Sequence, residues 1–401
     1  MLDFDVAQAQ LLEAGKPLEH IDDVPLHKAQ GRILARTLKA DLDMPPADNS
    51  AMDGYAIRFA DYQPGRGLPV QQRCFAGEQP QPLLSGQCIR LFTGSVIPEG
   101  ADTVIMQEDC TETDNVLTIN ELPALGKNIR KRGEDIRQGS VLLSAGDHIG
   151  AAQVALLATQ GHAQAPVFQR LKVGVLTTGD ELIEPGKPLQ AAQIYNSNGP
   201  MLAALIEGLG AEATHVLHAP DTLEATQQAL SKLIADCDLI ISVGGVSVGE
   251  KDLIKPAIEK AGGTLDLWRV RMKPGKPVAL AHAQGKPIVC LPGNPVSAFA
   301  VFALLVSPVV RRMQGREQCL PPVEYARLDS QAPFNDIRDE FIRVRADRNS
   351  NGDTRLSVFD RQGSGVVSSL PWSDGLARIP AGKQFGAGDL VPFYSWAHWL
   401  A

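Results

Sequence analysis

The segment DLIISVGGVSVG, residues 238–249, gives the strongest indication of the fold. Its first half, 238–243, is a short aliphatic run of the kind that forms a strand buried on both faces of a parallel sheet. The glycines that follow allow the backbone to turn sharply where this strand ends. Because open α/β sheets bind ligands at the carboxyl ends of their strands, this loop is a candidate ligand loop.

Strand-like and helix-like segments alternate on both sides of this segment. Residues 172–177 are also a buried-strand run, and a capping pattern opens a helix at 221–224. The aliphatic run at 287–291 leads into another helix that begins near Asn294. This alternation predicts a three-layer α/β domain with a mostly parallel sheet.

The remaining segments have a different character. Residues 1–43 show apolar spacing typical of helices, and a helical pattern returns at 153–157. Residues 44–140 contain many glycines and prolines between short β-like runs, which predicts a β-rich domain. The alternating runs within 319–401 predict a small β domain.

The composition is that of a soluble globular protein, with 401 residues, 44% hydrophobic residues and a net charge of -8. The acidic balance does not favour nucleic acid as a partner. The longest apolar run, 296–310, is shorter than the ~20 residues that span a bilayer, and no secretory signal is visible. The six cysteines form no CxxC motif. We therefore expect a cytoplasmic protein with reduced thiols and no membrane partner.

Three strand ends carry unusual loops: a first loop at 177–182 (TTGDEL), a second at 242–252 (SVGGVSVGEKD) and a third at 291–297 (LPGNPVS). Glycines let a backbone approach a ligand closely, and exposed amides can hold phosphate. Each loop alone could equally be a tight turn, but three in one domain favour a ligand site. None matches the P-loop or the dinucleotide-binding fingerprint.

Basic residues on a stiff frame are candidate anion ligands. The segment 273–277 (KPGKP) places two lysines three residues apart between prolines and a glycine, which suits a phosphate or another oxyanion. A plain β-turn is the alternative. The cluster at 130–132 (RKR) is more typical of a solvated charge run.

Several acids lie beside turns, namely Asp53, Asp135, Glu181, Asp221 and Asp252. Carboxylates beside phosphate-like loops suggest Mg²⁺, although Asp221 could instead cap a helix.

Two other kinds of site are less well supported. His215 and His218 would point to opposite faces of a strand, which disfavours a metal site there. Ser247 lies in a GxSxG match at 245–249, so a hydrolase remains an alternative without a clear His–acid partner set.

Taken together, these motifs resemble the MoeA-type molybdopterin molybdenumtransferases, which are related to the E domain of gephyrin. The resemblance rests on the three loops, the KPGKP segment, NSAMDGYA at 49–56 and RGED at 132–135. These motifs occur in family order and span nearly the whole chain.

The resemblance implies a multidomain α/β and β fold. It has a central three-layer α/β molybdopterin-binding domain, an inserted β-rich domain and a C-terminal β-barrel. It further implies an elongated homodimer. Each subunit would have four domains: a helical and linker domain at 1–44 with 139–170, then 45–138, 171–318 and 319–401.

The implied reaction is insertion of molybdate into adenylylated molybdopterin, with hydrolysis of the adenylate and release of AMP and molybdenum cofactor. Mg²⁺ is the implied ion, and molybdopterin adenylyltransferase is an implied partner in the same pathway.

The resemblance also implies roles for individual residues. For catalysis it implies Asp53, Asp135, Glu181, Lys273 and Lys276; for substrate binding Thr93, Arg130, Thr178, Gly179, Gly244, Gly245, Ser247, Pro292, Gly293, Asn294 and Pro295; for molybdate Lys273, Lys276, Arg343 and Ser364; and for Mg²⁺ Asp221 and Asp252. Because Asp53 and Asp135 come from the β-rich domain, each site could be completed across the dimer.

Two other functions compete with this interpretation. A gephyrin-like scaffold would favour a long linker and a second fused domain, which this chain lacks. An adenylyltransferase or nucleotide-hydrolysing relative can consist of little more than the α/β domain, whereas this chain has additional domains around it.

Overall fold

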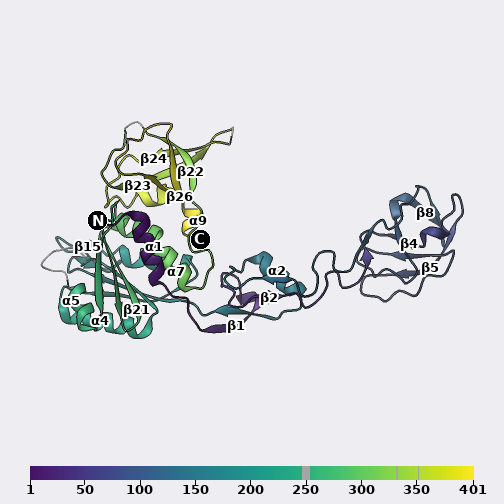
Figure 1. Cartoon of the computed structure of the whole chain (residues 1–401), viewed down its shortest axis with the longest axis horizontal. Helices are drawn as coiled ribbons and strands as arrows, with labels where there is room; N and C mark the ends of the chain where they lie inside the picture. Colours follow the sequence, from purple (N-terminus) through teal and green to yellow (C-terminus); the bar gives the residue numbers. More distant parts are fainter. Residues whose placement is uncertain (246–252, 331–332, 351) are drawn as a thin grey trace. The chain divides into compact units, whose positions relative to one another are not determined.

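The computed structural model of the protein describes residues 1–401 except 246–252, 331–332 and 351 (Figure 1). The chain folds into two compact units. The first unit comprises Met1–Arg36, Ala145–Ala151 and Gln164–Ala401, and the second comprises Thr37–Ser144 and Ala152–Ala163. The second unit is therefore an insertion in the first.

A six-stranded sheet forms the centre of the first unit. Its strands lie in the order β16 (Glu212–Ala219), β13 (Lys172–Thr178), β17 (Leu239–Val243), β21 (Lys286–Leu291), β20 (Pro277–Ala283) and β18 (Thr264–Arg269). The first four strands are parallel to one another. At the edge, β20 runs antiparallel to both of its neighbours, β21 and β18. The predicted mostly parallel sheet is confirmed.

Helices cover both faces of this sheet (Figure 1). On β17, Ile241 packs toward one face and Ile240 toward the other, as expected for a strand buried on both sides. The helices on the Ile241 face are α1 (Phe4–Ala14), α3 (Asn198–Gly208), α6 (Pro295–Val301) and α7 (Ser307–Met313), and those on the Ile240 face are α4 (Leu223–Asp236) and α5 (Ile254–Lys260). The predicted three-layer arrangement is confirmed.

Helices α6 and α7 are joined by a π-helical segment, η4 (Phe302–Val306). Pro308 has no N–H, so the carbonyl of Leu304 lacks its usual helical donor. The side-chain amide of Gln8, on α1, donates to this carbonyl oxygen at 2.7 Å. Helix α1 thus supplies a hydrogen-bond donor to a carbonyl that cannot receive one from Pro308.

By length and composition alone, the continuous helix Pro295–Met313 could cross a membrane. However, 89% of its most apolar window is buried within the protein. Its side chains belong to the main hydrophobic core with α1 and α3, so it is the core helix of the α/β fold.

A closed β-barrel forms the C-terminal part of the first unit. Its strands are β22 (Glu324–Asp329), β23 (Asp339–Arg348), β24 (Thr354–Val358), β25 (Gly375–Ile379) and β26 (Leu390–Ser395). The ring closes because β23 pairs with both β24 and β25, while β22 and β26 complete the circuit. The predicted barrel is confirmed, and the short helices α8 (Ser369–Trp372) and α9 (Trp396–Trp399) flank its strands.

The barrel is packed tightly against α1. Phe341 of β23 lies with its ring centroid 4.6 Å from that of Phe4. Arg378 of β25 forms ion pairs with Asp5 at 2.8 Å and with Asp339, so two carboxylates from different elements share one guanidinium. These contacts join the two ends of the first unit.

The prediction that residues 1–43 are largely helical is wrong beyond α1. The segment Ile21–Pro25 is strand β1, which pairs antiparallel with β12 (Gln164–Phe168), followed by a short 3-10 turn, η1 (Leu26–Lys28). Ile33 and Leu34 are buried, but they form isolated bridges with residues of the returning chain. Tertiary pairing therefore overrides the apolar spacing of this segment.

The second unit is built around another six-stranded sheet. Its strands lie in the order β7 (Thr103–Met106), β4 (Gly54–Ile57), β6 (Cys88–Leu91), β5 (Leu68–Cys74), β9 (Val116–Ile119) and β8 (Cys110–Thr113), with the 3-10 turns η2 (Phe59–Asp61) and η3 (Gln107–Asp109). The predicted β-rich insertion is confirmed.

The remaining elements of the second unit are smaller. They are the pair β2 (Leu38–Lys39) and β11 (Val141–Leu143), the pair β3 (Asn49–Ser50) and β10 (Ile129–Arg130), and helix α2 (Ala151–Thr159). The helical pattern predicted at 153–157 lies within α2. The exact boundaries of four domains stay a prediction.

Candidate functional site

The carboxyl ends of β13, β17 and β21 bring the three candidate loops together. The amide of Gly244 donates to the carbonyl oxygen of Leu291 at 3.2 Å. A Cβ atom at Gly244 would lie 3.2 Å from the hydroxyl oxygen of Thr178, and one at Gly293 would lie 3.8 Å from the Cα atom of Gly244. Residues from all three loops therefore line one small region at the carboxyl edge of the sheet.

Backbone conformation explains why glycines occupy two of these loops. Gly179, Gly244 and Gly245 have φ values of +142°, +89° and +65°, which side chains seldom allow. A Cβ at Gly179 would also lie 2.5 Å from a carboxylate oxygen of Glu181, whose side chain folds back over it. Replacing any of these glycines would therefore change the backbone conformation of its loop as well as add a side chain.

A hydrogen bond from Asn198, at the start of α3, fixes the third loop. The side-chain amide of Asn198 donates to the carbonyl of Gly293 at 2.7 Å. Pro292 precedes this glycine, and Asn294 occupies the cap position before Pro295 opens α6. The loop is thus fixed at both ends.

The β-barrel reaches this third loop through Ser364. The side-chain amide of Asn294 donates to the Ser364 hydroxyl at 3.0 Å, and the Val296 amide donates to the Ser364 carbonyl at 3.1 Å. The structure therefore brings Ser364 together with two residues of the third loop.

Asp221 lies at the end of β16, beside the first loop. Its amide donates to Oδ1 of Asp180 at 2.9 Å, which places two acidic residues next to each other. The N-cap of α4 is Thr222, whose hydroxyl accepts from the amide of Ala225. The alternative that Asp221 caps this helix is therefore wrong, and its carboxylate remains available to a ligand.

A pocket of about 730 Å³ opens beside these acids, between the end of β13, the end of β16 and the 182–196 segment that contains β14 (Leu182–Ile183) and β15 (Ile194–Tyr195). Asp180, Asn196 and His218 are among the residues that line it. The side-chain amide of Asn196 donates to Thr177 Oγ1 at 2.8 Å, so it is oriented toward the first loop.

The lysine-bearing turn at 273–277 packs against α6. Gly275 has φ +107°, and a Cβ there would lie 2.6 Å from Cγ2 of Val301. The turn therefore requires glycine at this position. Lys273 lies in the short strand β19 (Met272–Lys273), which pairs with β23 of the barrel.

The two lysines of this turn have different surroundings. The Lys273 ammonium forms ion pairs with Glu340 at 2.7 Å and Asp336 at 3.0 Å. These two carboxylates, Glu340 foremost, raise the pKa of Lys273 above its ordinary value. Lys276 is exposed and forms no ion pair within the described parts of the chain.

Arg343 is fully buried beneath the Ser364 segment. Its guanidinium donates to the carbonyl oxygens of Arg361, Gln362 and Gly363 at 3.0–3.1 Å and to the Ser369 hydroxyl at 3.0 Å. Burial lowers the pKa of Arg343 to about 10. These contacts fix the segment that carries Ser364, and a direct contact of Arg343 with molybdate stays a prediction.

In the second unit, two predicted residues contact each other. The amide and the hydroxyl of Thr93 both donate to Oδ1 of Asp53 at 2.8 Å. These bonds, the backbone one foremost, lower the pKa of Asp53.

The other predicted residues of this unit lie nearby in sequence but make different contacts. Arg130 pairs in β10 opposite Asn49, and the amide of Asp135 donates to the Met44 carbonyl at 3.0 Å. The neighbouring Lys131 and Arg132 are engaged by Asp48 and Asp43. Two of the three basic residues at 130–132 are therefore neutralised by neighbouring carboxylates.

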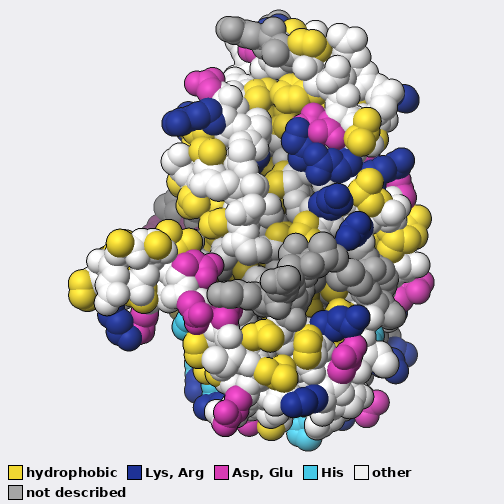
Figure 2. All heavy atoms as spheres, turned by 90° about the vertical axis from the view of Figure 1, so that its left-hand side faces the viewer, with side chains coloured by type: hydrophobic (Ala, Val, Ile, Leu, Met, Phe, Trp, Pro, Cys, Tyr) yellow, Lys and Arg dark blue, Asp and Glu magenta, His cyan; other side chains and the backbone are white. Residues whose placement is uncertain are grey.

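Two predicted residues, Ser247 and Asp252, lie outside the described residues. On the face in Figure 2, Lys and Arg side chains gather with several acidic side chains among them. Anion binding in this acidic chain would therefore depend on local groups of cations.

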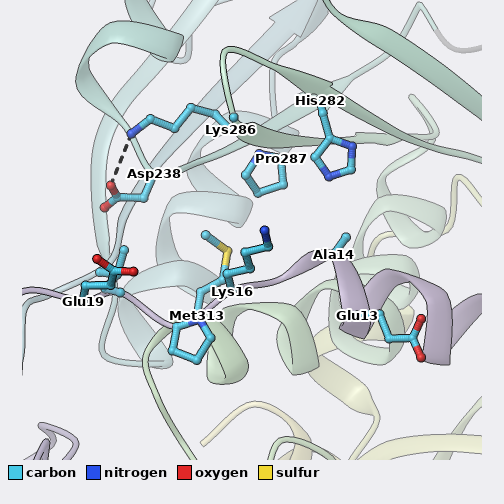
Figure 3. Close-up of a pocket in the computed structure, with 12 residues that line it drawn as sticks. Glu13, Ala14, Lys16, Glu19, Asp238, His282, Lys286, Pro287 and Met313 are labelled. Atoms are coloured by element: carbon cyan, nitrogen blue, oxygen red, sulfur yellow. Dashed lines mark ion pairs between the residues drawn. The ribbon is translucent and has the colours of Figure 1, made fainter.

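A second pocket, of about 590 Å³, opens at the amino ends of β17 and β21 (Figure 3). Asp238 and Lys286, which lie where these strands begin, form an ion pair of 3.5 Å, and the amine of Lys16 points into the space beside His282 (Figure 3). Since α/β sheets bind ligands at the carboxyl edge, the candidate site is the cluster of loops at the other end of the strands.

Some residues of this site could not be found by their sequence pattern. Asp180 is part of the TTGDEL motif, but its contact with Asp221 joins residues 41 positions apart. Asn198 carried no signal beyond its place before a helix. Nothing in the local sequence pattern links Asp336 or Glu340 to Lys273, so their contact appears only in the folded structure.

Three family models match the chain. They are the MoeA N-terminal region (domain I and II) over residues 2–161, a probable molybdopterin-binding domain over 174–312, and the MoeA C-terminal region (domain IV) over 325–396.

Individual relatives match over most or all of their length. A molybdopterin molybdenumtransferase from Haemophilus influenzae is 40% identical over 404 residues and covers 100% of both chains. Another from Nostoc sp. is 35% identical over 378 residues, covering 92% of this chain and 81% of its own. A molybdopterin biosynthesis MoeA protein from Pyrococcus horikoshii has a similar solved structure, with a TM-score of 0.83, 30% identity and 100% coverage of both chains.

Proposed function

Because the chain belongs to the MoeA-type molybdopterin molybdenumtransferase family, we propose that it inserts molybdenum into adenylylated molybdopterin. Family membership makes it a transferase of molybdenum cofactor biosynthesis. The finer proposal is that molybdate enters the dithiolene while the adenylate is hydrolysed, so that AMP and molybdenum cofactor are released together.

The observation that carries this proposal is the convergence of Thr178, Gly244 and Gly293 at the carboxyl edge of the sheet. Glycine backbone conformations at this edge permit close approach of a phosphoanhydride. Ser364 from the barrel is hydrogen-bonded to the same region, so a ligand there would meet groups from both the α/β fold and the barrel.

Mg²⁺ is the proposed ion, and the residues present are compatible with it. The Asp180 carboxylate accepts a hydrogen bond from the backbone amide of Asp221, so both acids belong to one corner of the site. Hard cations bind one or two carboxylates together with substrate phosphate oxygens. No set of three or more His, Cys, Asp or Glu side chains able to hold a metal occurs in the described parts of the chain, which suits an ion that shares ligands with its substrate. When bound, Mg²⁺ would offset the negative charge of the phosphoanhydride. Asp252 is proposed as a further ligand.

For molybdate, the proposed ligands are Lys273, Lys276 and Ser364. A tetrahedral dianion needs fixed donors, and the turn that carries both lysines is held by Gly275 against α6. Arg343 acts in this proposal by fixing the Ser364 segment from beneath.

Asp53, Thr93, Arg130 and Asp135 are proposed to complete the site from the second unit, with Glu181 on the first loop. In this proposal the working protein is a cytoplasmic homodimer in which the second unit of one subunit serves the first unit of its partner. Molybdopterin adenylyltransferase, which makes the substrate, is the proposed pathway partner.

The test supplies purified protein with adenylylated molybdopterin, Mg²⁺ and molybdate, and follows AMP and active cofactor together. We expect AMP release in step with active cofactor, and both to require molybdate. AMP release that ignores molybdate and yields no active cofactor would overturn the proposal.

A separate variant tests the proposed Mg²⁺ site. Asp221→Asn should lower the rate at limiting Mg²⁺ by at least tenfold, with partial recovery at high Mg²⁺. The matched control is Asp236→Asn, which changes an acid at the far end of α4 that pairs with His215. Equal Mg²⁺ dependence in both variants would remove Asp221 from the ion site.

A further inference from the structure

Lys273 is the more constrained of the two lysines in the proposed oxyanion site. Its ammonium contacts Glu340 Oε1 at 2.7 Å and Asp336 Oδ2 at 3.0 Å. The contact with Glu340 follows from strand pairing, because Lys273 and Glu340 are opposite each other in the register of β19 and β23. The Glu340 side chain is only 10% exposed, so its position is set by the barrel.

Asp336 is fixed in turn by Arg338. The Arg338 amide donates to Asp336 Oδ1 at 2.9 Å, and its guanidinium lies 3.3 Å from the same oxygen. Although burial raises the pKa of Asp336, the hydrogen bonds from Arg338 and Lys273 outweigh it and lower the pKa to about 2. The Asp336 carboxylate that contacts Lys273 is therefore ionised at every physiological pH.

These contacts reduce what Lys273 can offer an oxyanion. An ammonium has three N–H donors, and two already point to carboxylates. The charges of Lys273 and Arg338 are balanced by those of Asp336 and Glu340. Lys273 therefore supplies one donor in a fixed position and little net charge, whereas the exposed Lys276 supplies charge without a fixed position.

This division matters because charge cannot distinguish molybdate from sulfate. Both are tetrahedral dianions, and they differ mainly in the length of their metal–oxygen or sulfur–oxygen bonds. Donors at fixed positions can discriminate by size, whereas a mobile ammonium adapts to either ion. A site that must reject sulfate therefore benefits from a lysine whose ammonium cannot move to fit the smaller anion.

We propose that Glu340, together with Asp336, is a positioning residue that fixes Lys273 and thereby gives the site its preference for molybdate over sulfate. The inference rests on the proposed function. Glu340 acts through Lys273 and needs no contact with the substrate.

The experiment compares wild-type protein with Glu340→Gln in the insertion assay, at saturating adenylylated molybdopterin. It measures KM for molybdate, kcat, and the inhibition constant of sulfate. We expect kcat to change less than about threefold and the ratio of the sulfate inhibition constant to the molybdate KM to fall about tenfold, which corresponds to about 1.4 kcal/mol. Glu340→Asp, which keeps the charge, should recover part of the ratio.

The matched control is Glu324→Gln, which makes the same chemical change on β22 of the same barrel. Glu324 pairs with the exposed His398 at 3.1 Å, whereas Lys273 pairs with Asp336 and Glu340. This variant should keep the wild-type ratio. A purely structural role for Glu340 would lower thermal stability while leaving the ratio unchanged.

The outcomes separate the two proposals. Wild-type protein without molybdate-dependent insertion would refute the proposed function itself. Active wild-type protein with an unchanged ratio in Glu340→Gln would overturn the positioning role and leave the proposed function standing. If Glu340→Gln does not fold, Asp336→Asn removes the other carboxylate and decides the question by the same ratio.

Discussion

The side-chain amide of Asn294 donates a 3.0 Å hydrogen bond to the hydroxyl of Ser364, and this bond ties the third loop to the β-barrel. The two residues are 70 positions apart in the chain. The bond makes the barrel a part of the site, because a shift of the Ser364 segment would move the loop that follows β21.

The first prediction concerns this bond. Ser364→Ala should lower insertion activity about tenfold, while the loss of stability stays near 1 kcal/mol, because one ordinary hydrogen bond is removed. The backbone bond from Val296 to residue 364 remains in the variant. Activity and thermal unfolding are measured together.

Its control is Ser357→Ala, which removes a similar bond of 2.9 Å to Asp347 elsewhere in the barrel. The control should lose comparable stability and no activity. Equal activity in the two variants would contradict a role for Ser364 in the site.

The second prediction concerns Arg343. Arg343→Lys should destabilise the first unit by about 3 kcal/mol, because lysine cannot donate to three carbonyls at once and leaves buried acceptors unpaired. The midpoint of urea unfolding is the measurement. Arg348→Lys, an exposed exchange on the same strand, should have little effect. Unchanged stability together with lost molybdate binding would instead assign Arg343 to the oxyanion directly.

The third prediction concerns the lysine turn. Gly275→Ala should lower both thermal stability and molybdate affinity, because the new Cβ would lie 2.6 Å from Val301 and the turn must shift. The expected cost is about 2–4 kcal/mol, which combines the clash with an unfavourable φ. Gly285→Ala separates the two effects, because Gly285 also has a positive φ but nothing lies within 4 Å of its Cβ position. If the two variants lose equal stability, contact with α6 does not constrain the turn.

The fourth prediction concerns Asp53 and pH. Because Thr93 lowers the pKa of Asp53 below the ordinary 3.8, the carboxylate stays ionised as the pH falls through that value. Any stability that this interaction gives is present above pH 3.8 and is lost only as the pH falls through the lower folded value.

Thr93→Val removes the hydroxyl bond and keeps the amide bond, so the pKa of Asp53 should rise partway toward its ordinary value. Carboxyl-carbon NMR of Asp53 during an acid titration measures this shift. Thr118→Val, an exposed exchange on β9, serves as the control. An Asp53 titration identical to that of the wild-type protein would show that the hydroxyl contributes nothing.

The parts of the fold that the sequence predicted correctly are those whose signals are local. The aliphatic run at 238–243 and the glycines after it are sufficient to indicate a buried strand and a loop, and the observed β17 has the expected place in the sheet. The helical interpretation of 1–43 failed because β1 is defined by its partner β12, which lies far along the chain.

The candidate site shows the same division. Its glycine loops were visible in sequence because each is a strand end with unusual backbone requirements. The ion pair of Lys273 with Asp336 joins residues 63 positions apart, and no local pattern encodes it. Arg343 and Ser364 were reached only by family resemblance, because their place depends on how the barrel closes.

Strand β23 gives this architecture a practical consequence for building chimeras. Asp339, Glu340 and Arg343 lie within five consecutive positions of that strand, yet they contact respectively Arg378 of the barrel, Lys273 of the α/β fold and the segment at 361–363. A graft that exchanged residues 319–401 with those of a relative would replace both carboxylates that pair with Lys273, and the lysine would keep its ion pairs only if the relative also has acids at these two positions. Transplanting the barrel together with the 271–277 turn and helix α1 would keep every one of these charges with its partner.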